Sequence, residues 1–308
     1  MNHVTIFGID LTFDSVAFTI PIGDGWPITW YGILIALGFL LAIIYGIKNA
    51  ERLGVNTDKM LDVVIVTTPV AIVCARLYYI LFDPNRPEDV EFFGKDGLSG
   101  IGIYGAVIGA FACGAIMCKI KKIKVFDMFD LAAIAFLIGQ GIGRWGNFMN
   151  QEAFGSPTGS SWFGMTSENV VADFTQKGYD PTALAHPCFL YESIWCIAGF
   201  FLLHHLSKKR HFSGEITLLY CIWYGFERAI IENFRTDSLM LWGPIRVSVF
   251  VSVILFVGAL IALIVIRKKQ KTAVTDMDYE AMFDDGLDDI TNDETPEIET
   301  SDEVENNG

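Results

Sequence analysis

The sequence lacks the cysteine patterns that bind metals or form redox pairs. Its six cysteines include no C-x-x-C pair, and most lie in apolar stretches, at Cys74, Cys113, Cys118, Cys188, Cys196 and Cys221. We interpret them as small buried hydrophobic residues. The acidic, cysteine and histidine residues show no tight ligand spacing either, so we expect neither a metal nor another cofactor.

Basic residues are absent from the end of the chain. Residues 272–308 contain 14 acidic residues and no Lys or Arg, whereas the whole chain has 36 acidic and 22 basic residues and a formal net charge of −14. The rest of the chain therefore has 22 residues of each sign and is formally neutral. The acidic, weakly hydrophobic tail is expected to be disordered, and its charge indicates nothing about a partner of the active site.

The first residues of the sequence predict no secretory signal peptide. Residues 1–27 have no basic segment at their start, and Asp10, Asp14 and Asp24 interrupt them. We therefore interpret residues 1–29 as an external N-terminal segment that precedes the first apolar run.

Long apolar runs dominate the remaining sequence, which is 52% hydrophobic overall with a mean hydropathy of +0.41. Seven runs have about 17–22 residues each, enough to cross a hydrocarbon core of about 30 Å as a helix. Since backbone hydrogen bonds must be satisfied within lipid, we predict an all-α polytopic membrane protein with seven transmembrane helices. The predicted spans are Trp30–Ile47, Leu61–Phe82, Ile101–Cys118, Phe126–Ile142, Cys188–Leu206, Glu215–Asn233 and Ile245–Ile266.

The loops after alternate spans are rich in Lys and Arg, which predicts that they are cytoplasmic. We accordingly expect an external N-terminus and a cytoplasmic C-terminus. The predicted organisation is a membrane domain over 30–266, with an external cap segment at 143–187, followed over 267–308 by a cytoplasmic basic stretch and the acidic tail. The basic loop residues are Lys48, Arg52, Lys59, Lys119, Lys121, Lys122, Lys124, Lys208, Lys209, Arg210, Arg267, Lys268, Lys269 and Lys271.

Several charged residues and tyrosines fall within these predicted spans or at their ends. Inserting a charged side chain at the centre of a membrane-spanning helix costs about 2.5–3.5 kcal/mol. The presence of such residues therefore indicates a structural or functional role. In the predicted topology they gather toward the external face, which a shared polar cavity would require. They are Tyr31, Arg76, Tyr104, Arg144, Glu192, Arg228 and Glu232.

The sixth predicted span has the clearest pattern. Tyr224, Arg228 and Glu232 are spaced four residues apart and share one helix face, with Arg235 one turn further out. Arg228 and Glu232 could be an intrahelical pair that only neutralises its own charge. Alternatively, Arg228 and Arg235 bind an anionic headgroup, which suits the planar fork of arginine, while Glu232 orients them or accepts a proton.

Two further motifs flank the predicted cap. The run from Gly143 to Gly155 changes from apolar residues to Gly, Asn and Glu, and its Asn147 and Asn150 can donate and accept hydrogen bonds. It is either a ligand-binding segment or a turn that ends the fourth span. At the other end His186-Pro187 fits the start of a helix, where a histidine is more often a capping or packing residue than a base.

The run from Gly143 to Gly155, G-R-x-G-N-F-x-N-x-E-x-x-G, resembles the signature of the prolipoprotein diacylglyceryl transferase family. The resemblance covers roughly residues 20–266 and leaves out the acidic tail. Other similar pieces occur in the family's order: Trp30-Tyr31-Gly32, Ala75-Arg76-Leu77-Tyr78-Tyr79, His186-Pro187, Leu190-Tyr191-Glu192, Tyr224, Arg228, Glu232 and Phe234-Arg235.

The resemblance implies a seven-span enzyme, open to the outer leaflet, that transfers the sn-1,2-diacylglyceryl group of phosphatidylglycerol to the thiol of a lipobox cysteine in a prolipoprotein. Its expected partners are this lipid, the prolipoprotein and the surrounding membrane lipid. We expect no nucleic-acid partner. The catalytic residues we expect are Tyr31, Tyr104, Arg144, Glu152, Arg228 and Glu232. The expected lipid-binding residues are Arg76, Arg144, Asn147, Asn150, Gly155, Tyr224 and Arg235.

One departure from the family pattern concerns the base. Family members often carry H-G-G-x-x-G at the start of the third span, where this chain has Tyr104 in place of the histidine. A tyrosine hydroxyl keeps its proton at neutral pH and is a poor base, so a histidine-based mechanism does not carry over. Glu232 or Glu152 could assist thiol deprotonation. A transporter or flippase of an anionic lipid, and a non-catalytic membrane scaffold, are the alternative functions.

Overall fold

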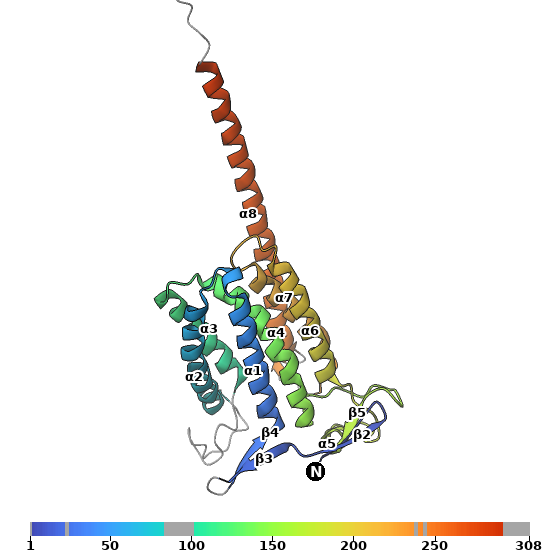
Figure 1. Ribbon diagram of the computed structural model, residues 1–308. Coiled ribbons are helices and arrows are strands. Elements are labelled where there is room, and N and C mark those ends of the chain that lie inside the picture. Colours follow the sequence, from blue (N-terminus) through green and yellow to red (C-terminus); the bar gives the residue numbers. More distant parts are fainter. Residues whose placement is uncertain (1, 22–24, 83–101, 237–239, 243–244, 292–308) are drawn as a thin grey trace, which may run out of the picture. The chain divides into compact units, whose positions relative to one another are not determined.

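A computed structural model of the chain describes residues 2–21, 25–82, 102–236, 240–242 and 245–291, and it is mostly helical (Figure 1). The chain divides into two compact units, Met1–Leu260 and Ile261–Gly308. The helices are α1 (Trp30–Asn49), η1 (Glu51–Leu53), α2 (Thr57–Phe82), α3 (Ile103–Ile120), α4 (Val125–Met149), α5 (Glu168–Lys177), α6 (Cys188–Ser207), α7 (Glu215–Ile231) and α8 (Val247–Thr291).

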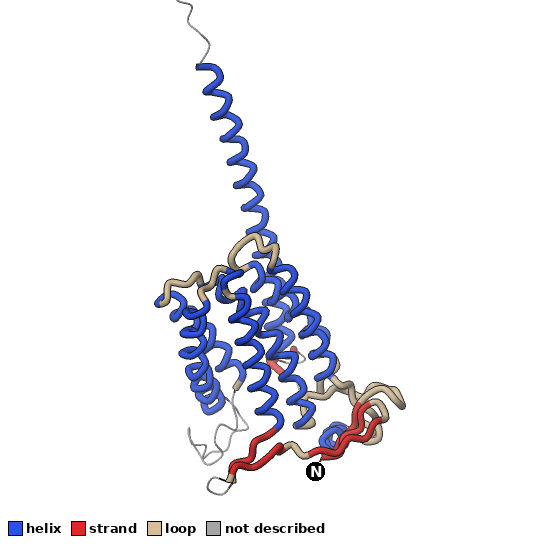
Figure 2. The backbone as a smooth tube through the Cα atoms, in the orientation of Figure 1, coloured by secondary structure: helices blue, strands red, loops and turns tan. Residues whose placement is uncertain are grey.

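Helix α4 is the centre of the first unit. It packs against α1, α6 and α7, while α2 and α3 pack against each other beside them (Figures 1 and 2). The apolar core between these helices includes Leu131, Ile134 and Leu137 of α4, together with Leu203 of α6 and Ile216 of α7, all nearly inaccessible to solvent.

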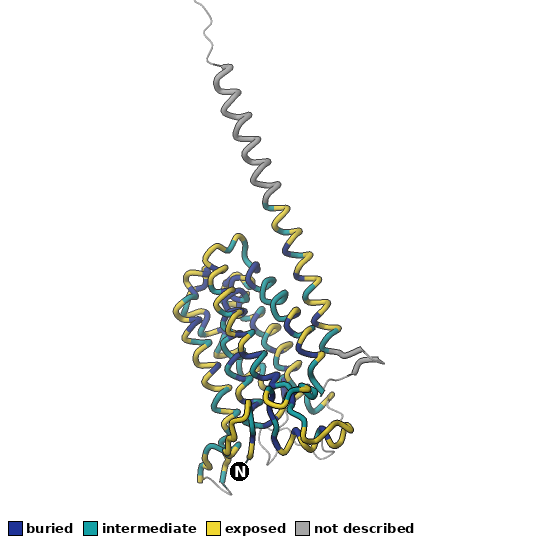
Figure 3. The backbone as a smooth tube through the Cα atoms, turned by 90° about the vertical axis from the view of Figure 1, so that its right-hand side faces the viewer, coloured by how far each residue is buried: buried dark blue, intermediate teal, exposed yellow. Residues whose placement is uncertain are grey.

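Within the described residues, six helices are long and apolar enough to cross a membrane: α1, α2, α3, α4, α6 and Ser248–Gln270 of α8. Figure 3 colours many residues of these helices as exposed. Many of them are large apolar residues, which lipid would cover. The chain is thus a polytopic membrane protein. The remaining predicted span corresponds to α7, which has 17 residues and contains Glu215, Glu227 and Arg228.

The all-α prediction missed the short strands before α1 and after α4. Strands β1 (Asn2–Ile6) and β2 (Ile9–Phe13) form a hairpin across Phe7 and Gly8, which both have positive φ angles of 51° and 77°, a pairing typical of tight hairpin turns. These strands are too short to stand out against seven long apolar runs. The other strands are β3 (Val16–Ile20), β4 (Trp26–Thr29), β5 (Met165–Ser167), β6 (Met240–Trp242) and β7 (Ile245–Arg246).

A small cap lies at the end of the bundle where α4 ends and α6 begins (Figures 1 and 2). Its sheet has the order β2-β1-β5, and α5 follows β5 directly. An apolar cluster joins the cap to the helix ends, because Val4 and Phe174 of the cap pack with Phe148 of α4 and Phe189 of α6. Since α4 continues to Met149, the first seven residues of the expected cap segment are helical instead.

The acidic tail was expected to be disordered, but its first part is helical. Helix α8 continues through the acidic residues as far as Thr291, and residues 292–308 lie outside the described part of the chain. Adding residues to an existing helix needs no new nucleation, so even a polar segment can continue one.

At the opposite end of α4, a buried ion cluster anchors the turn that leads into α7. Asp130 is fully buried and accepts four hydrogen bonds, from Arg210 Nη1 at 3.0 Å, the Gly214 N–H at 2.8 Å, and the Thr217 N–H and hydroxyl at 2.8 and 2.7 Å. Arg210 also lies 2.9 Å from Asp127 Oδ1. Every oxygen of Asp130 is therefore paired, as expected of a structural cluster.

We predict that Asp130→Ala destabilises the protein by at least about 1–3 kcal/mol, because the buried Gly214 N–H and the two Thr217 donors lose their acceptor. Thermal unfolding of the purified protein in detergent would measure this loss. Lys121→Gln is the control, since its ion pair with Asp62 is half exposed and should contribute about 0–1 kcal/mol. Equal unfolding midpoints for the two variants would contradict the anchoring role.

Candidate active site

Three arginines from different parts of the chain converge on the carboxylate of Glu192. This residue lies in the second turn of α6, and its side chain is 2% exposed. Its Oε2 lies 2.7 Å from Arg144 Nε of α4, and its Oε1 lies 2.9 Å from Arg228 Nη1 of α7 and 3.9 Å from Arg235 Nη1. Glu192 therefore joins the ends of three helices through its ion pairs.

The predicted Arg228–Glu232 pair is present, with Nη2 and Oε2 3.2 Å apart, but Arg228 also reaches across to α6. The pair is thus part of a larger network, not an isolated intrahelical contact. The prediction that Arg235 continues the helical stripe is wrong, because α7 ends at Ile231 and Glu232 caps it. Beyond this cap the chain turns, and Arg235 forms an isolated β-bridge with Gly155.

Arg144 keeps donors for a ligand. Its side chain is 24% exposed, and the contact between its Nε and Glu192 Oε2 lacks the alignment of a hydrogen bond. Within the described residues, its Nη1 and Nη2 groups donate no hydrogen bond. A partly open guanidinium of this kind can bind a phosphate through two parallel hydrogen bonds.

The loop after α4 brings Asn147, Asn150 and Glu152 together. Glu152 Oε1 accepts hydrogen bonds from Asn147 Nδ2 at 2.9 Å and from Asn150 Nδ2 at 3.4 Å. Between and after them, Gln151 and Ala153 have φ angles of 53° and 57°, a conformation that costs residues with a Cβ about 1–2 kcal/mol. This segment is therefore a tightly specified loop and not only the end of a span.

Tyr31 and Gly155 pack against this loop. A Cβ on Gly146 would lie 2.6 Å from Cδ2 of Tyr31, so the tyrosine ring lies directly on the α4 backbone. Gly155 donates its N–H to the carbonyl of His186 at 2.9 Å. The small residues thus permit close approach of segments that are far apart in the sequence.

The other predicted residues have different surroundings. Arg76 of α2 is buried, with its guanidinium carbon 5.6 Å from the centre of the Tyr79 ring. Tyr104 of α3 packs near Tyr78 of α2, so both belong to the α2–α3 pair. Tyr224 of α7 stacks on Tyr220 and experiences the charges of Arg144, Arg228 and Glu192.

Sequence reasoning assigned no role to two buried carboxylates of this part of the bundle. Glu192 was recognised as a polar residue at the external level but was not assigned to the site, although it pairs with three arginines there. Glu227 of α7, which is 5% exposed, was overlooked. An acidic residue within an apolar run next to Arg228 was the available signal.

His186 lies just before α6, and its Nδ1 is 3.1 Å from the Tyr191 hydroxyl. Burial lowers the pKa of His186, which favours a neutral ring packed against Phe234. The packing interpretation of this histidine therefore fits its surroundings.

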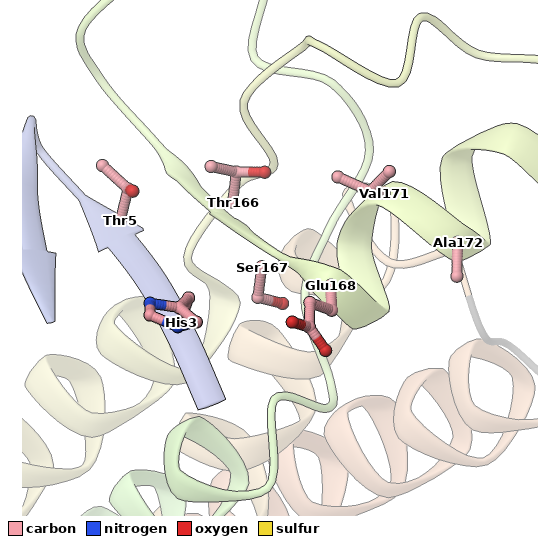
Figure 4. A pocket seen from close by; sticks show the side chains of 7 residues that line it. All are labelled: His3, Thr5, Thr166, Ser167, Glu168, Val171 and Ala172. Atoms are coloured by element: carbon pink, nitrogen blue, oxygen red, sulfur yellow. The ribbon is translucent and has the colours of Figure 1, made fainter. Parts of the chain in front are cut away.

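A separate open cavity of about 580 Å³ lies in the cap (Figure 4). Its walls are His3 and Thr5 of β1, Thr166 and Ser167 of β5, and the start of α5. No residue of the arginine network lines it. Within the described residues, no group of three or more His, Cys, Asp or Glu side chains is arranged to hold a metal ion.

The bundle of spanning helices defines a polytopic membrane protein, and a buried arginine–carboxylate network joins three of its helices. The sequence model of the prolipoprotein diacylglyceryl transferase family matches residues 15–265. The chain belongs to this family and is a transferase.

Curated relatives agree over most of the chain. Proteins named phosphatidylglycerol–prolipoprotein diacylglyceryl transferase from Limosilactobacillus reuteri and Pediococcus pentosaceus are 39% identical over 268 residues and 42% identical over 266 residues. Both alignments cover 85% of this chain and 94% of the relative. A protein of the same name from Clostridioides difficile is 37% identical over 268 residues, which are 85% of this chain and 99% of the relative.

We predict that Gly155→Ala destabilises the protein, since its Cβ would lie 2.7–2.9 Å from His186 Cβ, the Phe234 carbonyl oxygen and Cys188 Sγ. Overpacking of this kind costs about 1–3 kcal/mol, which thermal unfolding in detergent would measure. Gly139→Ala is the matched control, because nothing lies within 4 Å of its Cβ. If both variants unfold at the wild-type temperature, the close approach of Gly155 to His186, Phe234 and Cys188 does not contribute to stability.

A second prediction concerns the pH dependence of stability. Because burial lowers the pKa of His186, its contribution is fully present above the unfolded-state pKa of about 6.5 and is lost as the pH falls below it. Thermal unfolding of wild type and His186→Gln between pH 5 and 8 tests this. The difference between their midpoints should change below about pH 6.5, and parallel curves would exclude the effect.

Proposed function

We propose that the chain transfers the sn-1,2-diacylglyceryl group of phosphatidylglycerol to the thiol of the lipobox cysteine of prolipoproteins and releases sn-glycerol 1-phosphate. This would be the first step of bacterial lipoprotein maturation. The family match over residues 15–265 and the names of the relatives support the lipid and the acceptor protein. The observation that carries the chemistry is the convergence of Arg144, Arg228 and Arg235 on one buried carboxylate.

The arginines supply the electrostatic part of the reaction. The thiolate of the acceptor cysteine attacks a glycerol carbon, and the bond between that carbon and the phosphate oxygen breaks. Negative charge then accumulates on the departing phosphate, where preorganised cations in a low-dielectric site are most effective. Arg144 offers two free Nη groups, and Glu192 holds Arg144 and Arg228 in place.

The loop after α4 supplies the polar contacts to the lipid headgroup. In this proposal Asn147 and Asn150 bind its oxygens, with Glu152 fixing both amides through their hydrogen bonds. Gly155 permits the β-bridge that brings Arg235 beside this loop. Tyr31 and Tyr224 complete the wall of the site, while Arg76 and Tyr104 act from the α2–α3 pair.

The proposed topology places this site at the outer face of the membrane. It has seven spans, with α7 as the sixth, an external N-terminus and a cytoplasmic C-terminus. Its parts are the external segment 1–29, the catalytic domain 30–266 with the cap within 143–187, and the cytoplasmic part 267–308. Alternating basic loops support this orientation, and the buried network explains how a short helix with internal charges can lie in lipid.

We predict that Arg144→Ala lowers turnover by about 10²–10³-fold, the effect of removing one preorganised charge-stabilising donor. Purified protein is given phosphatidylglycerol and a lipobox peptide, and release of glycerol phosphate is measured. A peptide with serine in place of cysteine is the substrate control. Lys121→Gln should retain activity, because it removes only the partly exposed ion pair of Lys121 with Asp62, between the end of α3 and α2.

Wild-type protein that binds phosphatidylglycerol but releases no glycerol phosphate with the thiol peptide would exclude the transferase. Movement of intact lipid between leaflets under the same conditions would then favour a flippase. Unchanged turnover in Arg144→Ala would contradict the role of this arginine but would leave the proposed transferase activity standing.

A further inference from the structure

Arg52 is an arginine that forms no ion pair within the described residues. It lies in η1, directly after α1, at the end of the bundle opposite the cap (Figure 1), and it is exposed. Its Nη1 donates to Ser207 Oγ at 2.9 Å and its Nη2 to Asn49 Oδ1 at 3.2 Å, and both acceptors are neutral. Arg210, at the same end, contacts two aspartates instead. The charge of Arg52 therefore remains available to a ligand.

The two acceptors are themselves fixed by hydrogen bonds that link α1 to α6. Asn49 Nδ2 donates to the Tyr45 carbonyl at 2.9 Å, and Ser207 Oγ donates to the His204 carbonyl at 2.8 Å. The Tyr45 hydroxyl and His204 Nδ1, which are 2.9 Å apart, complete a closed ring of five residues, here named the Arg52 ring. Tyr45 and Ser207 are buried, so buried groups hold a guanidinium that is itself accessible. Arginine has more N–H donors than its two hydrogen bonds use.

The charged residues around the Arg52 ring are mostly basic. Among residues 45–53 and 203–209, Glu51 is the one acidic residue, and it forms no ion pair within the described part of the chain. Both Arg52 and Lys208 lie near enough to His204 for their charges to act on it. The basic residues of these two ranges are Lys48, Arg52, Lys208 and Lys209, together with His204 and His205. The surroundings therefore favour a negatively charged ligand.

The position of the Arg52 ring in the bundle indicates the kind of anion. Asn49 and Ser207 are the last residues of two helices that are long and apolar enough to cross a membrane. The ring thus lies where the apolar tails of a bilayer give way to headgroups. Phosphate is the anionic group at that level, and basic pockets between spanning helices bind lipid headgroups there. The planar fork of arginine suits a phosphate because it can donate two parallel hydrogen bonds.

We propose that the Arg52 ring binds the phosphodiester of an anionic phospholipid in the leaflet at the end of the bundle opposite the cap. This lipid is not the one that reacts, because the arginines around Glu192 lie at the other end of the helices. Its phosphate supplies the negative charge that the protein does not provide beside Arg52. Since the ring joins α1 to α6, the bound lipid stabilises the contact between these two helices.

The test measures thermal unfolding of the full-length protein in nanodiscs of phosphatidylcholine, with and without phosphatidylglycerol. The wild type should unfold at a higher temperature in the anionic discs, and Arg52→Gln should lose at least half of this lipid-dependent rise. Lys122→Gln is the matched control, because it removes an exposed positive charge from the turn between α3 and α4 at the same end of the bundle. This control should keep the full rise.

A ring that only clamps α1 to α6 predicts a different result. Arg52→Gln would then unfold at a lower temperature by the same amount in both kinds of disc, which would overturn the proposal. Arg52→Lys keeps the charge but cannot bind a phosphate through a planar fork. If Arg52→Gln does not fold, Arg52→Lys should show a reduced lipid-dependent rise, and a full rise in this variant would contradict the site.

The proposed active site also takes phosphatidylglycerol, so the two sites must be separated. The same measurement is therefore repeated in Arg144→Ala, with and without Arg52→Gln. Effects of distant, independent sites add, so Arg52→Gln should remove as much of the lipid-dependent rise from Arg144→Ala as from the wild type. No further loss in the double variant would overturn a separate site. None of these outcomes depends on whether the protein transfers lipid.

A soluble anion is the other source of the same chemistry. Inorganic phosphate added to wild type in phosphatidylcholine discs should raise the unfolding temperature much less than phosphatidylglycerol does. An equal rise, lost in Arg52→Gln, would overturn the assignment of a lipid, because the ring would then bind free phosphate.

Discussion

The arginine site depends on one buried carboxylate, that of Glu192. Several like charges at the ends of membrane-spanning helices repel one another, and their desolvation costs several kcal/mol for each ion. Glu192 offsets this by contacting Arg144 and Arg228 directly and Arg235 at longer range. Since these residues come from α4, α7 and the turn after α7, the same contacts hold the helix ends at fixed positions.

Two buried ion clusters lie near opposite ends of α4, and they differ in how completely they are paired. Both oxygens of Asp130 accept two hydrogen bonds from the turn into α7 and its first residues. At the other end, Nη1 and Nη2 of Arg144 and Oε1 of Glu227 have no hydrogen-bond partners within the described residues. Saturated polar groups stabilise a fold, whereas unsaturated buried groups are available to bind a ligand or a proton.

Much of the helical framework could be predicted because long apolar runs permit few alternatives in lipid. The four-residue spacing of Arg228 and Glu232 likewise predicted their contact, since it is a local property of a helix. The strands of the N-terminal segment, the end of α7 before Arg235 and the continuation of α8 to Thr291 were not predicted. Each depends on packing or on a helix boundary, where local sequence preferences are weak.

The sequence by itself determined the membrane-spanning character, the family and the set of polar residues near one face. Only the tertiary structure decided which of these residues pair with the same carboxylate, that of Glu192. Glu192 is distant in sequence from both Arg144 and Arg228, and only the packing of α4, α6 and α7 brings their charges within 3 Å. Periodicity shows which residues share a face of one helix, but the partner across a helix interface is set by the arrangement of the whole bundle.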